Sequence, residues 1–416
     1  MTKTKQKKIP KLRFPGFNDE WEEKNLGDFA DVSKLAGFEF TKHIAYSESG
    51  TLIGLRGLNI KNNKLDLSDV KYIDKSDLSK LNRSKLYIDD MMFTYVGTVG
   101  EVALIPENEK YYLAPNVSRI RVNKNVALPK FVEKYFNINI FKNKEIKSLI
   151  ATSSQPALSM TNIRKFRLNI PKIYEQEKIA GFLGAVDEKI DLLIKKKEQL
   201  EKYKKGLMQK IFNQEIRFKD KNGQNYPDWQ PKKLGDIFSG EKGSGLSWDD
   251  VTKDGKNKCI LYGELYTKYL EKIDYVLSRT AITSGVISKK NDLLLPCSTT
   301  TTGIDLANAT ALDEEGVLLG GDISVLRFKE SGSNLFYAYY LTHFMKYKLA
   351  AFGQGSTIVH MYYSHYKNMH IIEPALGEQK KVATFLSSID KKINLQERKL
   401  EKAKEFKKAL LQQMFI

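Results

Sequence analysis

The chain has 416 residues, of which 41% are hydrophobic and 28% charged, a composition typical of a folded soluble protein with two or three domains. With no apolar run long enough to span a bilayer and only 2 cysteines, it is neither a membrane-spanning protein nor a disulfide scaffold, and we expect it in the cytoplasm. The net charge of +18 predicts a polyanionic partner, most often nucleic acid, with a generally lysine-rich proteome as the alternative.

The basic charge is unevenly distributed along the chain. Residues 1–13 carry six Lys/Arg and no acid, and we expect a basic N-terminal arm that is disordered or else touches phosphates or a partner. Residues 14–174 sum to +5 (24 basic minus 19 acidic), and residues 219–377 sum to zero (18 minus 18). Any nucleic-acid contact must therefore be a localised face, and the second region should contribute less to salt-dependent affinity.

Residues 14–174 predict a first globular domain of mixed α+β type. Short apolar runs around "YIDDMMFTYVGTVGEVALIP" alternate with turns, and a helix is expected from Pro129. The glycine turn "YVGTVG" can bring backbone N–H groups to phosphate, and "SSQPALS" is a polar loop that can bond bases or phosphates. The candidate DNA contacts in this domain are Arg56, Arg83, Lys85, Tyr95, Gly97, Thr98, Gly100, Ser153, Ser154 and Gln155. A simple hairpin turn, a solvated basic face and a connecting loop are the corresponding structural alternatives.

Residues 175–214 predict a long amphipathic helix. Apolar residues recur in steps of three and four, and no proline interrupts the stretch from Glu175 to Phe212. At 1.5 Å per residue this is a rod of roughly 57 Å, too long to stand alone in water. The expected pairing core in this helix comprises Ile179, Phe182, Leu183, Val186 and Ile190.

Residues 215–374 repeat the first domain in outline. "PDWQPKKLGDI" matches "DEWEEKNLGDF" at an offset of 208, so that Trp229 meets Trp21, whereas the domain interiors have diverged. "CSTTTTG" falls at the place of the first glycine turn, and "GQGSTIVHMYYSHYK" at the place of the first polar loop. The candidate DNA contacts here are Ser298, Thr299, Thr300, Thr301, Thr302, Gln354, Ser356, Thr357, His360, Tyr362 and Tyr363.

Residues 375–416 predict a second long helix that repeats the first. "EQKKVATFLSSIDKKI" matches "EQEKIAGFLGAVDEKI" without a gap at an offset of 203. The expected pairing core in this helix comprises Val382, Phe385, Leu386, Ile389 and Ile393. Two equal stripes in one chain favour an intramolecular antiparallel coiled coil with a pseudo-twofold axis, although each helix could instead pack on its own domain or on another protein.

This architecture predicts a reader of two half-sites. Two related domains placed about a pseudo-twofold axis can address one face of a duplex, with centres about one helical turn apart for major-groove contacts. Because the two domain interiors differ, we expect the two half-sites to differ as well. The fold class we expect is α+β, with two globular domains separated by two long antiparallel helices.

The pattern resembles the specificity (S) subunit of type I restriction–modification enzymes, over essentially the whole chain. The resemblance is carried by "LRFPGFNDEWEEKNLGDF", "EIRFKDKNGQNYPDWQPKKLGDIF", the two "P…EQ.KIA.FL…D.KI" helix openings and "GTVGEVAL…NVSRIRV…PKFVEKYF". It implies two target recognition domains, two conserved helical regions and an asymmetric bipartite target in double-stranded DNA. It also implies two docked methyltransferase (M) subunits, with restriction (R) subunits joining them.

An enzyme is the less favoured interpretation. The chain has no NPPY-like motif, no GxxxxGK[ST], and no glycine-rich S-adenosylmethionine loop in a strand–helix context. His360, His365 and His370 are five apart, so they would not share a helix face, and we expect no metal site and no catalytic residue. S-adenosylmethionine, ATP and Mg are expected in partner subunits. The alternative function is a non-catalytic coiled-coil scaffold with two protein-binding domains.

Overall fold

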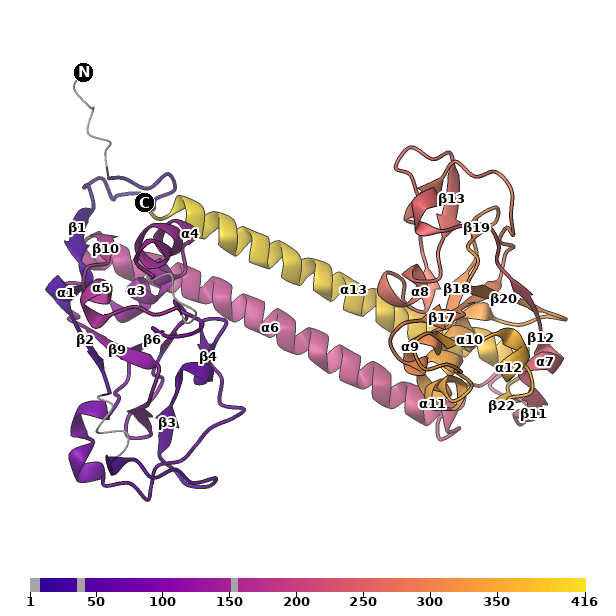
Figure 1. Cartoon of the computed structure of the whole chain (residues 1–416), viewed down its shortest axis with the longest axis horizontal. Helices are drawn as coiled ribbons and strands as arrows, with labels where there is room; N and C mark the ends of the chain where they lie inside the picture. The colour runs from indigo at the N-terminus through magenta and orange to yellow at the C-terminus, as the bar shows by residue number, and fades with distance from the viewer. Residues whose placement is uncertain (1–7, 36–41, 151–155) are drawn as a thin grey trace. The chain divides into compact units, whose positions relative to one another are not determined.

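The computed structural model describes residues 8–35, 42–150 and 156–416. They divide into two compact units: the described residues up to 194 together with 398–416 form unit 1, and residues 195–397 form unit 2. Both units mix helices with sheets, so the predicted α+β class is confirmed (Figure 1). The two predicted long helices are present as α6 (Ile173–Phe212) and α13 (Leu376–Gln413), and each contributes residues to both units.

Unit 1 is built on an antiparallel four-stranded sheet with the order β2-β9-β6-β7. Its strands are β2 (Ala30–Lys34), β6 (Met91–Thr94), β7 (Val102–Leu104) and β9 (Val117–Val122), beside a parallel pair β3 (Ile53–Leu55) and β8 (Tyr111–Leu113) and a hairpin β4 (Ile60–Lys61) and β5 (Lys64–Leu65). The main helices are α3 (Pro129–Phe136), α4 (Asn139–Phe141) and α5 (Met160–Arg164). Strand β6 is buried on both faces, and Phe93 packs edge-on against Phe136 and Phe166 at centroid distances of 5.7 and 5.9 Å.

Unit 2 repeats this frame and extends it. Its five-stranded sheet has the order β12-β20-β16-β18-β14, in which the last strand joins parallel to its neighbour. The strands are β12 (Phe238–Lys242), β14 (Lys272–Ile273), β16 (Asp292–Pro296), β18 (Thr310–Leu312) and β20 (Ile323–Phe328), with a smaller sheet of β13 (Asn257–Ile260), β15 (Ser278–Thr280) and β19 (Leu318–Leu319). Its helices are α8 (Glu264–Thr267), α9 (Gly303–Leu306), α10 (Asn334–Tyr339), α11 (Lys346–Ala350) and α12 (Tyr363–Tyr366).

The repeated Leu-Gly-Asp sequence forms the same one-turn helix in both units. It follows β1 (Glu22–Asn25), paired with β10 (Arg167–Ile170), in unit 1, and β11 (Gln230–Lys233), paired with β22 (His370–Glu373), in unit 2. The carboxylates of Asp28 and Asp236 accept the backbone N–H three residues earlier at 3.0 and 2.9 Å, which caps α1 (Leu26–Phe29) and α7 (Leu234–Ile237). A Cβ on Gly27 would lie 3.0 Å from Arg164, which ends α5, and one on Gly235 would lie 3.0 Å from the carbonyl oxygen of Lys367, which follows α12, so this close approach favours glycine.

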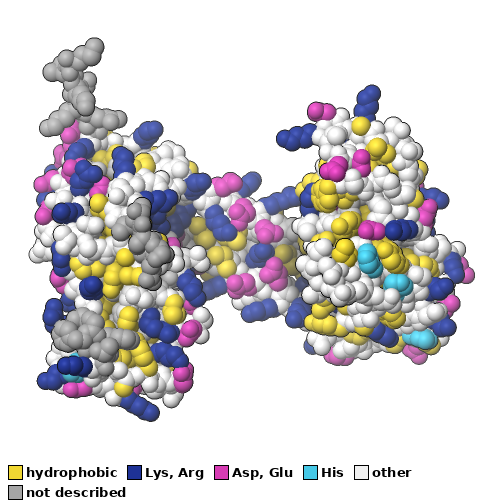
Figure 2. All heavy atoms as spheres, in the orientation of Figure 1, with side chains coloured by type: hydrophobic (Ala, Val, Ile, Leu, Met, Phe, Trp, Pro, Cys, Tyr) yellow, Lys and Arg dark blue, Asp and Glu magenta, His cyan; other side chains and the backbone are white. Residues whose placement is uncertain are grey.

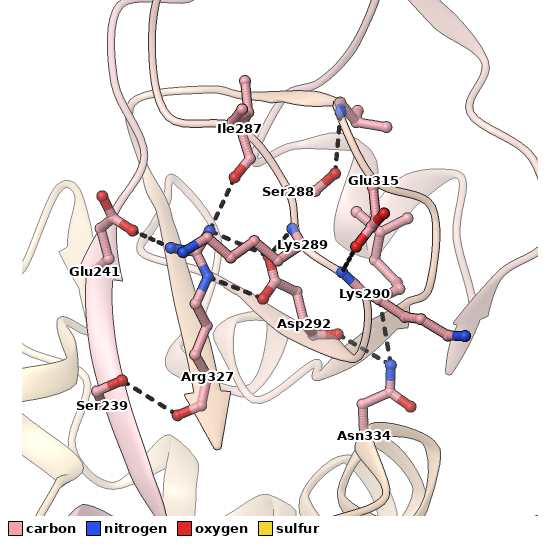
Figure 3. A network of polar contacts seen from close by, with 12 residues as sticks. Ser239, Glu241, Ile287, Ser288, Lys289, Lys290, Asp292, Glu315, Arg327 and Asn334 are labelled. Atoms are coloured by element: carbon pink, nitrogen blue, oxygen red, sulfur yellow. Dashed lines mark hydrogen bonds and ion pairs between the residues drawn. The ribbon is translucent and has the colours of Figure 1, made fainter. Parts of the chain in front are cut away.

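A buried aspartate paired with a partly exposed arginine holds the central strands together in each unit. Arg121 donates to both carboxylate oxygens of Asp90 at 2.7 Å. In unit 2, Arg327 donates to Asp292 at 3.0 and 3.3 Å and to the carbonyl of Ile287 at 2.9 Å (Figure 3). Both aspartates also accept a backbone N–H three residues earlier, so each pair fixes the start of β6 or β16 against β9 or β20.

Charged side chains of both signs are interspersed on each unit. On the face in view in Figure 2, lysine and arginine side chains lie among acidic and hydrophobic ones on each unit. This agrees with the modest sums of +5 and zero for the two domain sequences. Nucleic-acid contact would therefore depend on individual groups placed by the fold.

Candidate nucleic-acid interface and its helix anchors

The first glutamate of the doubled "EQ" motif anchors the start of unit 1 to α6. Glu175, 2% exposed, accepts two 2.7 Å hydrogen bonds from Arg13, one at each carboxylate oxygen. The indole Nε1–H of Trp21 donates to the same carboxylate at 3.3 Å. We call this trio the Arg–Glu–Trp anchor. Within the described part of the expected N-terminal arm, Arg13 is thus tied to the domain rather than offered to solvent.

The same anchor recurs in unit 2. Arg217 donates to both oxygens of Glu378 at 3.2 and 2.8 Å, and Trp229 Nε1–H donates to it at 3.0 Å. Glu378 is 0% exposed. A neighbouring aromatic contact is repeated too, because Phe14 packs edge-on against Phe182 at 5.7 Å and Phe218 against Phe385 at 5.5 Å.

The glutamine of the motif fastens a second segment of each domain to its helix. Gln176 donates to the carbonyl of Pro171 at 2.8 Å, and its Oε1 accepts from the backbone N–H of Leu128 at 2.7 Å, just before α3. Gln379 donates likewise to the carbonyl of Pro374 at 2.9 Å and accepts from Ser333 N–H at 3.0 Å, just before α10. The doubled motif is therefore a two-point clamp between domain and helix.

Within each unit the helices α6 and α13 pack against each other. In unit 1, Ile190 and Leu193 form a buried cluster with Leu400. In unit 2, Val382 and Leu386 share the main core with Met208 at the far end of α6. The other predicted pairing residues are placed as follows: Ile179 and Leu183 in the main core of unit 1, Val186 beside it, Ile389 and Ile393 buried in unit 2, and Phe182 and Phe385 against the phenylalanines of the domain starts.

A salt bridge between the two helices is also duplicated. Asp187 pairs with Lys407 at 2.5 Å in unit 1, and Asp390 pairs with Lys204 at 2.7 Å in unit 2. These residues are related by the same offset of 203, so one contact appears twice with its members exchanged between the helices. This exchange is what a pseudo-twofold repeat of antiparallel helices requires.

The surroundings of the duplicated bridge differ between the units. In unit 1 the third group is Lys134, 2.7 Å from Asp187. In unit 2 Lys204 also binds Glu271 at 2.9 Å, and His343 contacts the same carboxylate. Burial acts to raise the pKa of Glu271, but the bond from His343 and the charge of Lys204 outweigh it and lower the pKa to about 2. This network lines a cleft of about 740 Å3.

We expect unit 2 to lose stability in acid through Glu271. Since its folded pKa of about 2 lies below the ordinary 4.5, its contribution is present above pH 4.5 and is lost as pH falls toward 2. The loss should be on the order of 3 kcal/mol. The free energy of unfolding, measured by chemical denaturation across this pH range, should fall less steeply with decreasing pH for E271Q than for the parent chain. D274N, at an exposed carboxylate nearby, is the matched control, and an equal effect of both substitutions would contradict the assignment.

In unit 1 the fold brings two predicted DNA-contact segments together. Val96 of the glycine turn bridges Ala157 of the polar loop, Gly97 N–H donates to the carbonyl of Pro156 at 3.1 Å, and Leu158 N–H to that of Tyr95 at 2.9 Å. Gly97 and Gly100 have φ of 77° and 100°, which glycine adopts without strain. Ser153, Ser154 and Gln155 lie outside the described residues.

The equivalent segments of unit 2 also pair. Strand β17 (Ser298–Thr299) lies antiparallel to β21 (Val359–His360). Ser298 and Thr299 are buried there, whereas the following Thr300, Thr301 and Thr302 are exposed. The hairpin that leads into β21 exposes Gln354, Ser356 and Thr357, while Tyr362 and Tyr363 after it are half-buried.

The remaining candidates of unit 1 lie apart from this junction or are already engaged. Arg56 donates to the carbonyl and carboxylate of Asp69 at 2.9 and 3.2 Å, and with Thr98 it lines a cleft of about 710 Å3. Arg83 is exposed, and its carbonyl accepts from Arg119 at 3.1 Å. Lys85 pairs with Glu109 at 3.2 Å.

Sequence reasoning missed a repeated lysine–tyrosine contact at this junction. Lys34, the last residue of β2, lies over the ring of Tyr95 at 5.5 Å. Lys242, the last residue of β12, lies over the ring of Tyr362 at 5.0 Å. The two lysines are related by the offset of 208, which was the available signal, but their tyrosines come from different segments.

Groups that could do chemistry are scarce in the described ranges. No cluster of three or more His, Cys, Asp or Glu among the described residues is arranged to hold a metal ion. Burial raises the pKa of both Cys259 and Cys297 to about 11, so neither thiol is an activated nucleophile. The helices within residues 8–35, 42–150 and 156–416 include none that is both long and apolar enough to cross a membrane.

The geometry defines a class of protein: a duplicated α+β module, each copy clamped to a pair of long helices and presenting a different surface at the same place. The family model described as "Type I restriction modification DNA specificity domain" matches residues 18–202 and again residues 226–405. The chain therefore belongs to the type I restriction–modification specificity subunit family, as the resemblance predicted.

Individual relatives agree with this assignment. The chain is 24% identical to the MjaX specificity subunit of Methanocaldococcus jannaschii, over 98% of this chain and 95% of the relative. It is 25% identical to the EcoKI specificity subunit of Escherichia coli, over 47% of this chain and 42% of the relative. The S subunit of M. genitalium has a similar fold, with a TM-score of 0.61 at 16% identity over 98% of this chain and 99% of that chain.

Proposed function

We propose that this chain is the DNA-reading subunit of a type I restriction–modification complex and binds an asymmetric bipartite target in double-stranded DNA, one half per domain. The observation that carries the proposal is the contrast within the repeat. Anchors, clamps and interhelical bridge are the same in both units, whereas the junction carries a glycine turn in unit 1 and a threonine run in unit 2. A constant frame with variable loops suits two readers of unlike half-sites.

The two helices would fix the spacing between the half-sites and hold the partner subunits. Their exposed apolar residues are repeated: Leu192 and Leu395 are 64% and 54% exposed, and Tyr203 and Phe406 are 56% and 54% exposed. Each pair is related by the offset of 203, so equivalent apolar sites lie on the helix segments of each unit. Such sites suit two copies of one partner. We assign them to two methyltransferase subunits, with restriction subunits joining and with S-adenosylmethionine, ATP and Mg bound outside this chain.

The test is a domain exchange read by methylome sequencing. Replacing residues 219–374 with the corresponding domain of another family member should change one half of the methylated sequence and leave the other half intact. Deleting the chain should abolish methylation at the whole motif. If methylation survives the deletion, the proposal fails and the protein-binding scaffold becomes the better interpretation.

Lys34 and Lys242 should contribute unequally to salt-dependent DNA binding. Lys242 is partly neutralised by Asp322 at 3.1 Å, whereas no carboxylate among the described residues pairs with Lys34. In the assembled methyltransferase, K34A should reduce the slope of log K against log salt by about 1, and K242A by less. The charge-preserving K34R and K242R are the controls. Equal slope changes for the two alanine variants would contradict this prediction.

A further inference from the structure

The junction of unit 2 contains a polar cluster that connects three of the candidate DNA contacts, Ser298, His360 and Tyr362. Ser298 Oγ lies 2.8 Å from Asp322 Oδ2 and 2.9 Å from His360 Nδ1. The ring of Tyr362 stacks on that of His360 at 5.6 Å and an interplanar angle of 14°, and its hydroxyl lies 3.2 Å from the same Nδ1. Tyr362 in turn lies beneath Lys242 and edge-on to His365.

The hydrogen bonds of Ser298 to Asp322 and His360 determine the tautomer of His360. Lys242 Nζ is 3.1 Å from Asp322 Oδ1, and this contact raises the pKa of Lys242. A carboxylate can only accept, so the single hydroxyl proton of Ser298 is committed to Asp322. The Ser298 oxygen must then accept from His360, which places a proton on Nδ1. In neutral His360 the other nitrogen, Nε2, carries a lone pair.

That lone pair is open to a ligand. His360 is half-buried, no described residue forms a hydrogen bond with its Nε2, and Nε2 is not among the fully buried atoms that lack a partner. His360 ends the hairpin whose tip exposes Gln354, Ser356 and Thr357. Figure 2 shows histidine side chains at the surface of unit 2.

An acceptor at this place can discriminate between bases. In the major groove adenine N6 and cytosine N4 are donors, whereas guanine O6 and thymine O4 are acceptors. We propose that His360 Nε2 accepts a hydrogen bond from the exocyclic amino group of an adenine or a cytosine in the half-site read by unit 2. Ser298 and Asp322 act as positioning residues that hold the proton on Nδ1. This inference rests on the proposed DNA-reading function.

The test uses the assembled methyltransferase and methylome sequencing of the His360 variants. The half-site read by unit 2 is the one that changes when residues 219–374 are exchanged. H360A should reduce discrimination between bases roughly tenfold at one position of that half-site and leave the other half-site unchanged. H360K, whose ammonium can only donate, should shift the preference at that position toward guanine or thymine. S298A removes the acceptor that holds the proton on His360 Nδ1, so it should reduce discrimination between bases at the same position. H370A, at an exposed histidine on β22, is the control and should leave the motif intact.

The outcomes separate this inference from the proposed function. If the domain exchange changes the half-site but H360A and H360K leave every position unchanged, His360 does not read a base and only the inference is overturned. If H360K relaxes the position without reversing its preference, the acceptor assignment is overturned. If the domain exchange itself has no effect on the motif, the proposed function fails. Melting temperatures equal to that of the parent complex exclude unfolding as the cause.

Discussion

Replacing Glu175 with alanine should lower the free energy of unfolding of unit 1 by about 3–5 kcal/mol, the range found when one member of a buried ion pair is removed. The side chain of Arg13 is 11% exposed and would lose both of its carboxylate bonds. The indole N–H of Trp21 would lose its acceptor within the same core. Since the anchor ties the domain start to α6, the backbone amides of strands β1 and β10 should lose protection against hydrogen exchange together.

Replacing Glu378 with alanine should lower the free energy of unfolding of unit 2 by less, about 2–3 kcal/mol, although Glu378 is as buried as Glu175. Arg217 keeps other acceptors, namely Asp228 at 3.1 Å and the carbonyls of Tyr226 and Pro227 at 3.2 and 2.6 Å. Its side chain is also 22% exposed, so water can solvate the guanidinium that remains. The two anchors are equivalent in sequence but unequal in the partners that remain after truncation.

Hydrogen exchange of the assembled complex measures both effects by unit. E175A should accelerate exchange in β1 and β10 and leave β11 and β22 unchanged, and E378A should do the reverse with a smaller amplitude. E177A, an exposed glutamate in the same helical turn as Glu175, is the matched control. Equal acceleration by E175A and E177A would show that the buried carboxylate does not hold the domain.

The repeated frame was predictable from the sequence because local signals specify it. The two long helices follow from apolar steps of three and four, and the equivalence of the two domain starts follows from the Leu-Gly-Asp match at an offset of 208. The partners of the doubled glutamate were not predictable. Arg13 and Arg217 are 204 apart, an offset that matches neither the 203 of the helices nor the 208 of the domain starts. Nothing local to either arginine indicates a carboxylate more than 150 residues away.

The candidate interface shows the same division between local and long-range information. Its segments were recognisable as glycine, threonine and polar loops, but their mutual pairing depends on strand contacts across 60 residues or more, such as Ser298 with His360. The tautomer of His360 depends on Asp322, in the turn before β20, and on Lys242, at the end of β12. Residue type alone therefore indicated polar contact, while the direction of each hydrogen bond required the fold.

Lengthening both long helices by one heptad should change the gap in the recognised DNA sequence and leave both half-sites unchanged. The insertion points are after Ile194 in α6 and after Glu397 in α13, which are also the positions where units 1 and 2 divide. Seven residues add about 10.5 Å, or roughly three base pairs at 3.4 Å each. A heptad is the insertion that keeps the paired helix faces aligned.

The duplicated interhelical bridges supply the control for this experiment. The residue numbers of Asp187 and Lys407 add up to 594, and so do those of Lys204 and Asp390. A constant sum is expected when both bridges belong to one antiparallel register. Lengthening both helices preserves both bridges, whereas lengthening α6 alone forces one bridge out of register and should abolish methylation. The motif of the double insertion is read by methylome sequencing. If a base within either half-site changes while the gap stays constant, the helices do not set the spacing.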